Sequence, residues 1–209
     1  NMSHELRTPL NSLLILAKEL GKNNKKNLND NQVKDLSIIY ESGVDLLNLI
    51  NDILDLSKIE AGRMIANLAE VQLQNIVINL ENQFAHVARQ KNIGFTIKPQ
   101  EGIEMVITDQ QRLEQILKNL LSNAIKFTSQ GEVKLNISRS DKLMELRSKM
   151  YNPGEVLLFS VIDTGIGIEE NKQAMIFEAF QQADGGLSRQ YGGTGLGLTI
   201  SRQIAALLG

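Results

Sequence analysis

The sequence predicts an α-helical segment followed by an α/β domain, and three observations support this fold class. Residues 1–66 contain almost no strand pattern, and their apolar positions recur at helical spacing. After Gly62 the pattern changes to long helices beside runs typical of strands. The chain has 209 residues, 42% of them hydrophobic, which suffices for one large domain or two modest ones. We therefore expect a helical hairpin over 1–62 and a two-layer α/β sandwich over 63–209.

Composition and charge argue against several classes of function. The net charge of −2 gives no basic field, so no nucleic-acid partner is expected. Cysteine is absent, which excludes disulfides and thiolate chemistry and fits a reducing, cytoplasmic location. His4 and His86 lack the spacing of metal ligands. No run reaches the ~20 apolar residues of a membrane helix. Both ends look cut, so we expect any membrane segment outside this sequence.

The first helix is predicted to be amphipathic, with a histidine on its polar side. At about 100° per residue, His4 lies roughly 200° from Leu6, so its imidazole should point away from the apolar seam. Pro9 removes the backbone donor to the carbonyl of Glu5 and predicts a kink beside His4. Such a local rule violation is typical of functional sites. The seam itself consists of Leu6, Leu10, Leu13, Ala17 and Leu20.

A second, longer helix follows a polar loop. Residues 21–31 are rich in Asn and Lys, and Asp30 is a candidate cap for the next helix. From Gln32 to about Ala61 the apolar face is wider than one facing helix can cover. It predicts pairing of two hairpins into a dimeric four-helix bundle. Alternatively, the second domain or a missing segment covers the excess. Gly62 is expected to end the helix.

The second domain is expected to mix helices and strands. The expected strands lie near 93–99, 131–139 and 155–163. The expected helices lie near 72–91, 109–127 and 169–177, with a last one from about 195.

The first motif with chemical potential is RLEQILKNLLSNAIKFT at 112–128. Carboxamide oxygens suit Mg²⁺ and an ammonium suits phosphate, so its polar stripe is a candidate site for Mg²⁺-bound phosphates. A solvated helix face explains this segment equally well. The stripe consists of Asn119, Asn123, Lys126 and Phe127, at i, i+4, i+7 and i+8. The apolar face beside it consists of Leu113, Ile116, Leu117, Leu120 and Ala124.

Two glycine-containing motifs follow. In FSVIDTGIGI, an apolar strand ends on Asp163, and a buried carboxylate there could accept a hydrogen bond from an adenine amino group. Gly165 and Gly167 would let the base approach, although an ordinary Asx turn is the alternative. In YGGTGLGLTI, glycines open the last helix and predict an anion site, although the motif is not a P-loop. Residues 181–190 before it are a predicted lid, from which Arg189 could reach phosphate.

Five motifs in this order closely resemble the kinase core of two-component sensor histidine kinases. They are SHELRTPLN, NLLSNAIKFT, DTGIGI, FEAF and GGTGLGL, which match the histidine, asparagine, first glycine, phenylalanine and second glycine boxes. LINDILDLSKIEAGRM also resembles the second dimerisation helix of such kinases, particularly hybrid ones. The resemblance covers nearly the whole chain and implies a GHKL-type ATP-binding domain. We expect the helix before the histidine box and the closing strands to be missing here.

The resemblance implies a homodimer that phosphorylates itself with ATP and Mg²⁺ and then an aspartate of a response-regulator receiver domain. His4 would be the phosphoacceptor and Glu5 the base that takes its proton. Asn123 would ligate Mg²⁺, and Asp163 would read the adenine. The other nucleotide-binding residues that it implies are Asn119, Lys126, Phe127, Gly165, Gly167, Arg189, Gly193, Thr194, Gly195, Leu196 and Gly197.

Two further roles come from the same resemblance. Glu5 to Thr8 fits the family's ExxT pattern, in which a threonine orients a water for dephosphorylation of the partner. It implies phosphatase activity toward the regulator. Phe177 and Phe180 would anchor the lid, although ordinary core packing also describes them.

Two alternative functions were considered, an ATP hydrolase with the same fold and a module without enzymatic activity. Gyrase-type topoisomerases, heat-shock chaperones and mismatch-repair ATPases place a glutamate four residues before the metal-binding asparagine. Here Asn119 holds that position and cannot act as a base. A non-enzymatic sensing or dimerisation module is the other alternative, which the intact His4, Asn123 and Asp163 argue against.

Transfer of a phosphoryl group from ATP to His4 would require a hinge near 61–66, so that the ATP-binding domain can approach the histidine.

Overall fold

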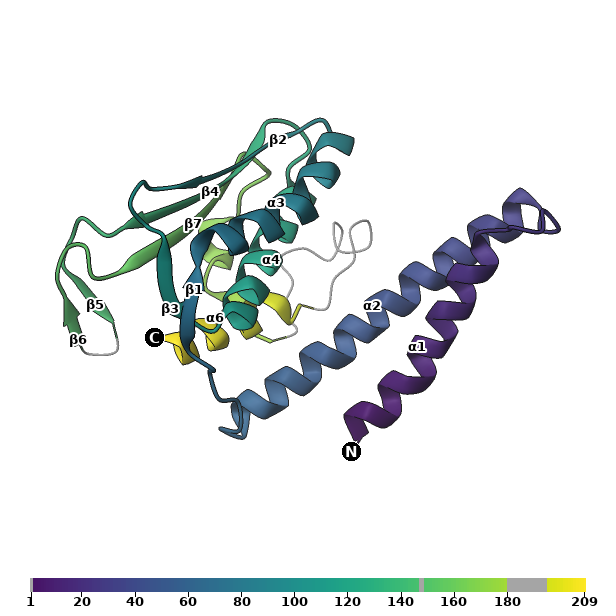
Figure 1. Cartoon of the computed structure of the whole chain (residues 1–209), viewed down its shortest axis with the longest axis horizontal. Coiled ribbons are helices and arrows are strands. Elements are labelled where there is room, and N and C mark those ends of the chain that lie inside the picture. The colour runs from purple at the N-terminus through teal and green to yellow at the C-terminus, as the bar shows by residue number, and fades with distance from the viewer. Residues whose placement is uncertain (1, 147–148, 180–194) are drawn as a thin grey trace. The chain divides into compact units, whose positions relative to one another are not determined.

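The computed structural model describes residues 2–146, 149–179 and 195–209, without the side chains of residues 2–4 and 6. The chain divides into two compact units, Asn1–Met64 and Ile65–Gly209 (Figure 1). Within the described ranges, no helix combines the length and apolarity that crossing a membrane requires.

The first unit is a hairpin of two long helices. They are α1 (Met2–Gly21) and α2 (Asp30–Glu60). α1 is a single helix that continues through Pro9. The two helices pack closely at Gly43 of α2, where an added Cβ would lie 2.6 Å from Cδ2 of Leu14. Arg7 also joins the helices, because its guanidinium donates to Oδ1 of Asn51 at 2.8 Å.

The seam between these helices differs from the predicted one. Ala17 is buried and Leu10 is half-buried, as expected, but Leu13 and Leu20 are exposed by 61% and 55%. Leu14, which the predicted seam omitted, is buried instead. The reason is that α1 carries two apolar stripes. One stripe contacts α2 and the other remains on the surface of the single chain. The spacing of three and four residues between apolar positions therefore does not show which stripe packs against α2.

The caps of α2 show one wrong and one confirmed prediction. The N-cap is Asn29 and not Asp30: the side chain of Asn29 accepts from the backbone N–H of Gln32 at 2.9 Å, and Gln32 accepts from the N–H of Asn29. This reciprocal pair satisfies two donors at the helix start. At the other end, Gly62 has a φ of 63°, and its N–H and that of Arg63 donate back to the last turn at 2.9 and 2.8 Å. Gly62 therefore ends the helix as predicted.

The second unit contains the α/β layer. Its helices are α3 (Leu73–Gln90), α4 (Gln110–Phe127) and α6 (Gly197–Leu208), with 3-10 turns η1 (Glu170–Lys172) and η2 (Met175–Phe177). Its strands are β1 (Ala69–Gln72), β2 (Gly94–Pro99), β3 (Met105–Thr108), β4 (Glu132–Arg139), β5 (Met144–Leu146), β6 (Lys149–Tyr151) and β7 (Leu157–Asp163). The predicted helices at 72–91 and 109–127 and all three predicted strands are confirmed. The short helix expected over 169–177 is two 3-10 turns.

The main sheet has the order β2-β4-β7, with β2 parallel and β7 antiparallel to the central β4. Figure 1 shows α3 and α4 over this sheet, and α6 packs against α4. Every second residue of β4 faces the helices, so Val133, Leu135 and Ile137 are at most 1% exposed. Leu117 and Leu121 of α4 cover them from the helical layer. This packing makes α4 the central helix of the unit.

Two strand pairs were not predicted from the sequence. β1 pairs with β3, and β5 pairs with β6. β1 and β3 are four residues each and lie far apart in the chain. A segment of that length carries too few alternations to be distinguished from loop.

Candidate functional site

The predicted polar stripe lies along α4, whose start is fixed by a cap. Oδ1 of Asp109 accepts from the backbone N–H of Arg112 at 3.1 Å, and Oδ2 accepts from the N–H of Asn67 at 2.9 Å. All four stripe residues are half-buried. At the far end, Nζ of Lys126 lies 5.1 Å from the centroid of the Phe127 ring.

The second motif closes on the end of α4. The N–H of Gly165 donates to Oδ1 of Asp163 at 2.8 Å, and the N–H of Ile166 approaches the carbonyl oxygen of Phe127 at 3.4 Å. An added Cβ on Gly165 would lie 2.5 Å from that carbonyl oxygen. A glycine is therefore required for this close approach, and it brings the turn after β7 against the last turn of α4.

Asp163 departs from the expected environment. The sequence predicted a buried carboxylate, but the side chain is exposed at the last residue of β7. The strand is at the edge of the main sheet, where one side has no neighbouring strand in the described part of the chain. Its bond to Gly165 is the Asx-type turn that was the alternative interpretation. The turn and a ligand-facing role are compatible, because Oδ1 alone makes this contact.

The third motif meets the other end of the stripe. Nδ2 of Asn119 donates to Oγ of Ser201 in α6 at 2.9 Å. An added Cβ on Gly197 would lie 2.3 Å from Oδ1 of Asn119. Gly195 has a φ of 69° just before the helix, and Leu196 is fully buried. The side chain of Leu196 thus packs in the core, which leaves its backbone for any contact with a nucleotide.

Several predicted residues lie outside the described part of the structure. They are Arg189, Gly193 and Thr194, with the predicted lid at 181–190 and Phe180. Of the phenylalanine pair, Phe177 is described: its carbonyl accepts from Oγ1 of Thr199 at 3.0 Å, and the guanidinium of Arg202 lies 5.8 Å from its ring centroid. It is 37% exposed, which is not ordinary core packing. Gly167 is exposed, with a φ of 69°.

The phosphoacceptor candidates belong to the other unit. His4, Glu5 and Thr8 lie in α1. Glu5 and Thr8 are exposed, and the side chain of His4 lies outside the described atoms. The exposed side of α1 therefore carries Glu5 and Thr8, which follow His4 by one residue and by about one turn.

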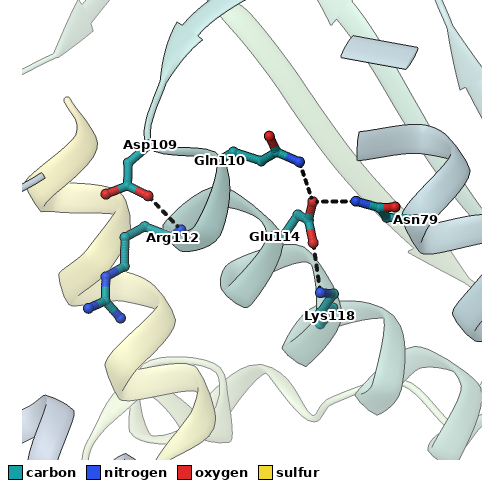
Figure 2. A network of polar contacts seen from close by, with 6 residues as sticks. All are labelled: Asn79, Asp109, Gln110, Arg112, Glu114 and Lys118. Carbon is teal, nitrogen blue, oxygen red and sulfur yellow. Dashed lines mark hydrogen bonds and ion pairs between the residues drawn. The ribbon is translucent and has the colours of Figure 1, made fainter. Parts of the chain in front are cut away.

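A buried acidic residue was not anticipated from the sequence. Figure 2 shows Glu114 of α4 directed at α3, where its carboxylate accepts from Asn79, Gln110 and Lys118. The three distances are 2.9, 2.9 and 2.7 Å. Burial alone would raise the pKa of Glu114, but the hydrogen bonds and the charge of Lys118 outweigh it, so the pKa is lowered. No local pattern distinguishes this glutamate from one on a solvated helix face.

The orientation of Glu114 bears on the hydrolase alternative. It is the acidic residue of α4 nearest to Asn119, the position at which the gyrase-type ATPases considered above carry their base. Its carboxylate is held between α3 and α4, and its pKa is lowered. A buried carboxylate with a lowered pKa is a poor general base. The described contacts of Glu114 are therefore with side chains of α3 and α4.

The described residues contain no cluster of three or more His, Cys, Asp or Glu side chains that could hold a metal ion. A cavity of about 260 Å³ lies away from the stripe, beside Gln72, Pro99 and Met105. It includes none of the predicted site residues.

Two family models match the chain. The His Kinase A (phospho-acceptor) domain matches residues 1–62, and the histidine kinase-, DNA gyrase B- and HSP90-like ATPase matches residues 108–209. The chain belongs to the sensor histidine kinases of two-component systems and carries the two domains of a protein-histidine kinase.

Similar proteins include known kinases of this family. The chain is 40% identical over 99% of its length to the autoinducer 2 sensor kinase/phosphatase LuxQ of Vibrio vulnificus. It is 41% identical over 100% of its length to the circadian input-output histidine kinase CikA of Synechococcus elongatus. It covers 23% and 26% of those two proteins, so it spans about a quarter of their length. The crystal structure of full-length ShkA with AMPPNP matches with a TM-score of 0.75 and 33% identity, over 99% of this chain and 40% of that one.

Proposed function

We propose that the chain is the catalytic core of a kinase that transfers the γ-phosphoryl group of ATP to His4 and then to an aspartate of a response-regulator receiver domain. One observation carries the proposal most: both glycine motifs close on α4, one at Asn119 and one at Phe127. Two glycine motifs from later in the chain therefore border the helix that carries the third motif. A nucleotide that contacts all three needs this arrangement.

The residues of α4 also fit a Mg²⁺-bound triphosphate. Asn123 is half-buried and offers a neutral carboxamide oxygen, and Lys126 offers a cation one turn further along the helix. We infer that Asn123 would ligate Mg²⁺, Lys126 and the loop at Gly195 would hold phosphate, and Asp163 would accept from the adenine amino group. Bound Mg²⁺ would neutralise charge on the phosphates. Phe127 would pack near the nucleoside.

The chemical step needs few groups. A nitrogen of the neutral His4 imidazole forms a bond to the γ-phosphorus, and the bond between that phosphorus and the β,γ-bridging oxygen breaks, which releases ADP. The proton on the other nitrogen passes to the carboxylate of Glu5. Glu5 directly follows His4 in α1 and its side chain is exposed, which supports this role. Catalysis is then mainly positioning and charge stabilisation, as in other phosphoryl transfers.

We also propose that the hairpin forms a homodimer. Large apolar side chains remain exposed along both helices, including Ile39, Leu46 and Ile53 at spacings of seven. A seven-residue repeat of this kind is typical of helices that pack in bundles. The exposed residues on α1 are Leu13, Ile15, Leu16 and Leu20. The packing of α1 against α2 leaves them exposed, as a bundle formed with a second hairpin would require.

The domain boundaries and the cellular location are part of the same proposal. We assign residues 1–62 to dimerisation and phosphoacceptance and 63–209 to ATP binding. The division of the chain after Met64 supports a hinge near 61–66. Use of ATP and the lack of cysteine favour the cytoplasmic side, with any membrane anchor in other segments of the protein.

A phosphatase activity toward the regulator is proposed on Thr8. It is exposed and lies one turn after His4, and LuxQ is named a sensor kinase/phosphatase. Thr8→Ala should lose regulator dephosphorylation and keep autophosphorylation, measured as decay of phosphorylated receiver domain. Unchanged decay would refute this role.

The kinase proposal is tested with γ-³²P-labelled ATP. The purified chain should acquire a label that is labile to acid and stable to base, which is the signature of phosphohistidine, and His4→Gln should abolish it. His86→Gln is the matched control, because it removes the other histidine and should leave the label intact. Label that persists in His4→Gln would place the acceptor elsewhere.

A further inference from the structure

Asn119 differs from its neighbours on the stripe because both ends of its carboxamide face α6. Nδ2 donates to Oγ of Ser201 at 2.9 Å. The ideal Cβ position on Gly197 lies 2.3 Å from Oδ1, 2.9 Å from Cγ and 3.2 Å from Nδ2 of Asn119. The amide group thus contacts α6 at Gly197 and, one turn further along, at Ser201.

The contact is closed to solvent on the α6 side. Ser201 is 7% exposed, and Asn119 is half-buried between the helices. A buried hydroxyl and a carboxamide that satisfy each other are costly to separate, because each would be left without a partner. Gly197 has no positive φ, so its missing side chain is explained by the close approach of Asn119 and not by backbone strain.

The geometry has a consequence for the start of α6. The helix begins at Gly197, and the residue before it, Leu196, makes no side-chain cap. The backbone N–H groups of this first turn are the ones that would face phosphate in the proposed function. Asn119 touches the helix at this turn. Thr199 and Arg202 hold the same helix to Phe177 through the contacts described above.

We propose that Asn119 is a positioning residue that docks the first turn of α6 onto α4, through Ser201 and Gly197, and is not a ligand of metal or phosphate. The inference rests on the proposed function, because its effect on activity passes through the phosphate-binding start of α6. It assigns the two asparagines of the stripe different tasks: Asn123 to the ligand and Asn119 to the helix that faces the ligand.

A size exchange across the contact tests this assignment. Gly197→Ala places a methyl group where Asn119 sits, and should weaken binding of AMPPNP with Mg²⁺ at least tenfold by calorimetry on the whole chain. Adding Asn119→Ala to Gly197→Ala makes room again and should recover part of the affinity. A ligand role for Asn119 requires the opposite, since the double variant would lose a ligand as well. A double variant that binds worse than Gly197→Ala overturns the proposal.

A second pair of variants tests the hydrogen bond. Asn119→Ala and Ser201→Ala should each weaken AMPPNP binding about five- to tenfold, which corresponds to about 1.0–1.4 kcal/mol. Their double variant should be no weaker than the weaker single one. Neither should change the Mg²⁺ concentration needed for half-maximal binding, whereas Asn123→Ala should raise it. Ser57→Ala, an exposed serine of α2, is the matched control and should behave as wild type. A shifted Mg²⁺ requirement in Asn119→Ala with normal binding in Ser201→Ala overturns the proposal.

Failure of the proposed function would appear differently. If the wild type bound no nucleotide, the contact would still be measurable by hydrogen exchange of the α6 amides. Asn119→Ala and Ser201→Ala should both speed exchange over residues 197–203, and their effects should not add. Unchanged exchange in either variant contradicts the docking role, whatever the nucleotide does.

Discussion

The hairpin and the α/β unit bury apolar residues to very different extents. In the described part of the hairpin unit, the buried apolar side chains are Leu14, Ala17, Leu56 and Met64. In the α/β unit, several large side chains are completely covered, among them Ile76, Leu80, Leu121, Leu135, Leu196 and Ile204. The second unit thus completes its core from its own helices and sheet, whereas the first leaves large aliphatic side chains exposed on both helices.

Polar contacts differ in the same way. Several of the hairpin's described side-chain bonds, such as Arg7 to Asn51 and Ser37 to Glu41, lie on its exposed surface, and those between Asn23 and Leu28 are only part-buried. The α/β unit holds the buried carboxylate of Glu114 with three donors. A unit with a well-buried core suits the precise placement of a nucleotide, and an exposed apolar surface suits assembly with a second chain. The variants below test this contrast.

The largest loss of nucleotide affinity is expected when one methyl group is added to the α/β unit. In Gly165→Ala, the new Cβ would lie 2.5 Å from the carbonyl oxygen of Phe127, which must move. Since the turn at Asp163 and the end of α4 would separate, affinity for AMPPNP should fall at least about 100-fold, or about 3 kcal/mol. Calorimetric titration measures it. Gly102→Ala is the control: it also adds a methyl group to a glycine, but that glycine has a φ of 80° and nothing within 4 Å. It should lose stability and keep affinity.

In the hairpin, charge on the exposed apolar face should break the dimer and leave the fold of the second unit intact. The side chain of Leu46 is 48% exposed in the single chain and would be buried in the proposed bundle, so Leu46→Glu would place a carboxylate there. An unpaired buried carboxylate is strongly unfavourable, so the dimer dissociation constant should rise about 100-fold or more. Sedimentation measures it. Ile107→Glu, at a 75% exposed position of β3, is the control and should remain dimeric. A dimeric Leu46→Glu would remove this explanation of the exposed face.

Glu114 gives a pH-dependent test that is confined to the α/β unit. Its pKa in the folded chain is lowered from 4.5, so the unfolded state binds its proton more tightly. The carboxylate therefore stabilises the fold above that pH, and the contribution is lost as the pH falls through the lower, folded value. Glu114→Gln should cost about 1–3 kcal/mol at pH 7, because the amide keeps only one acceptor oxygen for three donors and loses the charge that pairs with Lys118.

Hydrogen exchange of the α3 and α4 amides follows that loss locally. The difference between wild type and Glu114→Gln should be constant from pH 7 to about 5 and shrink below 4.5. Glu41→Gln, which removes an exposed carboxylate from α2, should show little difference at any pH. A pH-independent gap for Glu114→Gln would mean that its carboxylate is not the stabilising form.

Periodicity and turn chemistry predicted most of the long elements, because these signals are local. The stop at Gly62 follows from the need for a left-handed residue after the helix, and β4 follows from its strict alternation. β1 and β3 were not predicted, because their pairing joins short segments that are remote in sequence. The prediction of Asp30 as the cap was wrong, because Asp and Asn can both cap a helix and only the backbone geometry decides that Asn29 does so.

In the candidate site, too, some features could be predicted from the sequence and others could not. The stripe on α4 could be placed from spacing, because a helix fixes which side chains share a face. The hydrogen bond from Asn119 to Ser201 could not be predicted, because Ser201 is 82 residues away and nothing in the local sequence distinguishes it from other helical serines. The exposure of Asp163 depends on which strands flank β7, and the burial of Glu114 depends on the packing of α3. Each is a consequence of tertiary contacts that no local pattern encodes.

The smallest effects should come from the two helix caps, which compare the units directly. Asn29→Ala removes an exposed cap in the hairpin and should cost about 0.5–1 kcal/mol of unfolding free energy. Asp109→Ala removes a cap that is 9% exposed and also holds the N–H of Asn67, so about 2 kcal/mol is expected. Asp109→Ser keeps an N-cap oxygen for Arg112 and loses only the contact to Asn67, so it should fall between wild type and Asp109→Ala. Denaturant unfolding measures all three. Equal losses for Asn29→Ala and Asp109→Ala would mean that burial adds nothing to the cap, and that the α/β unit is no more tightly organised than the hairpin at its helix ends.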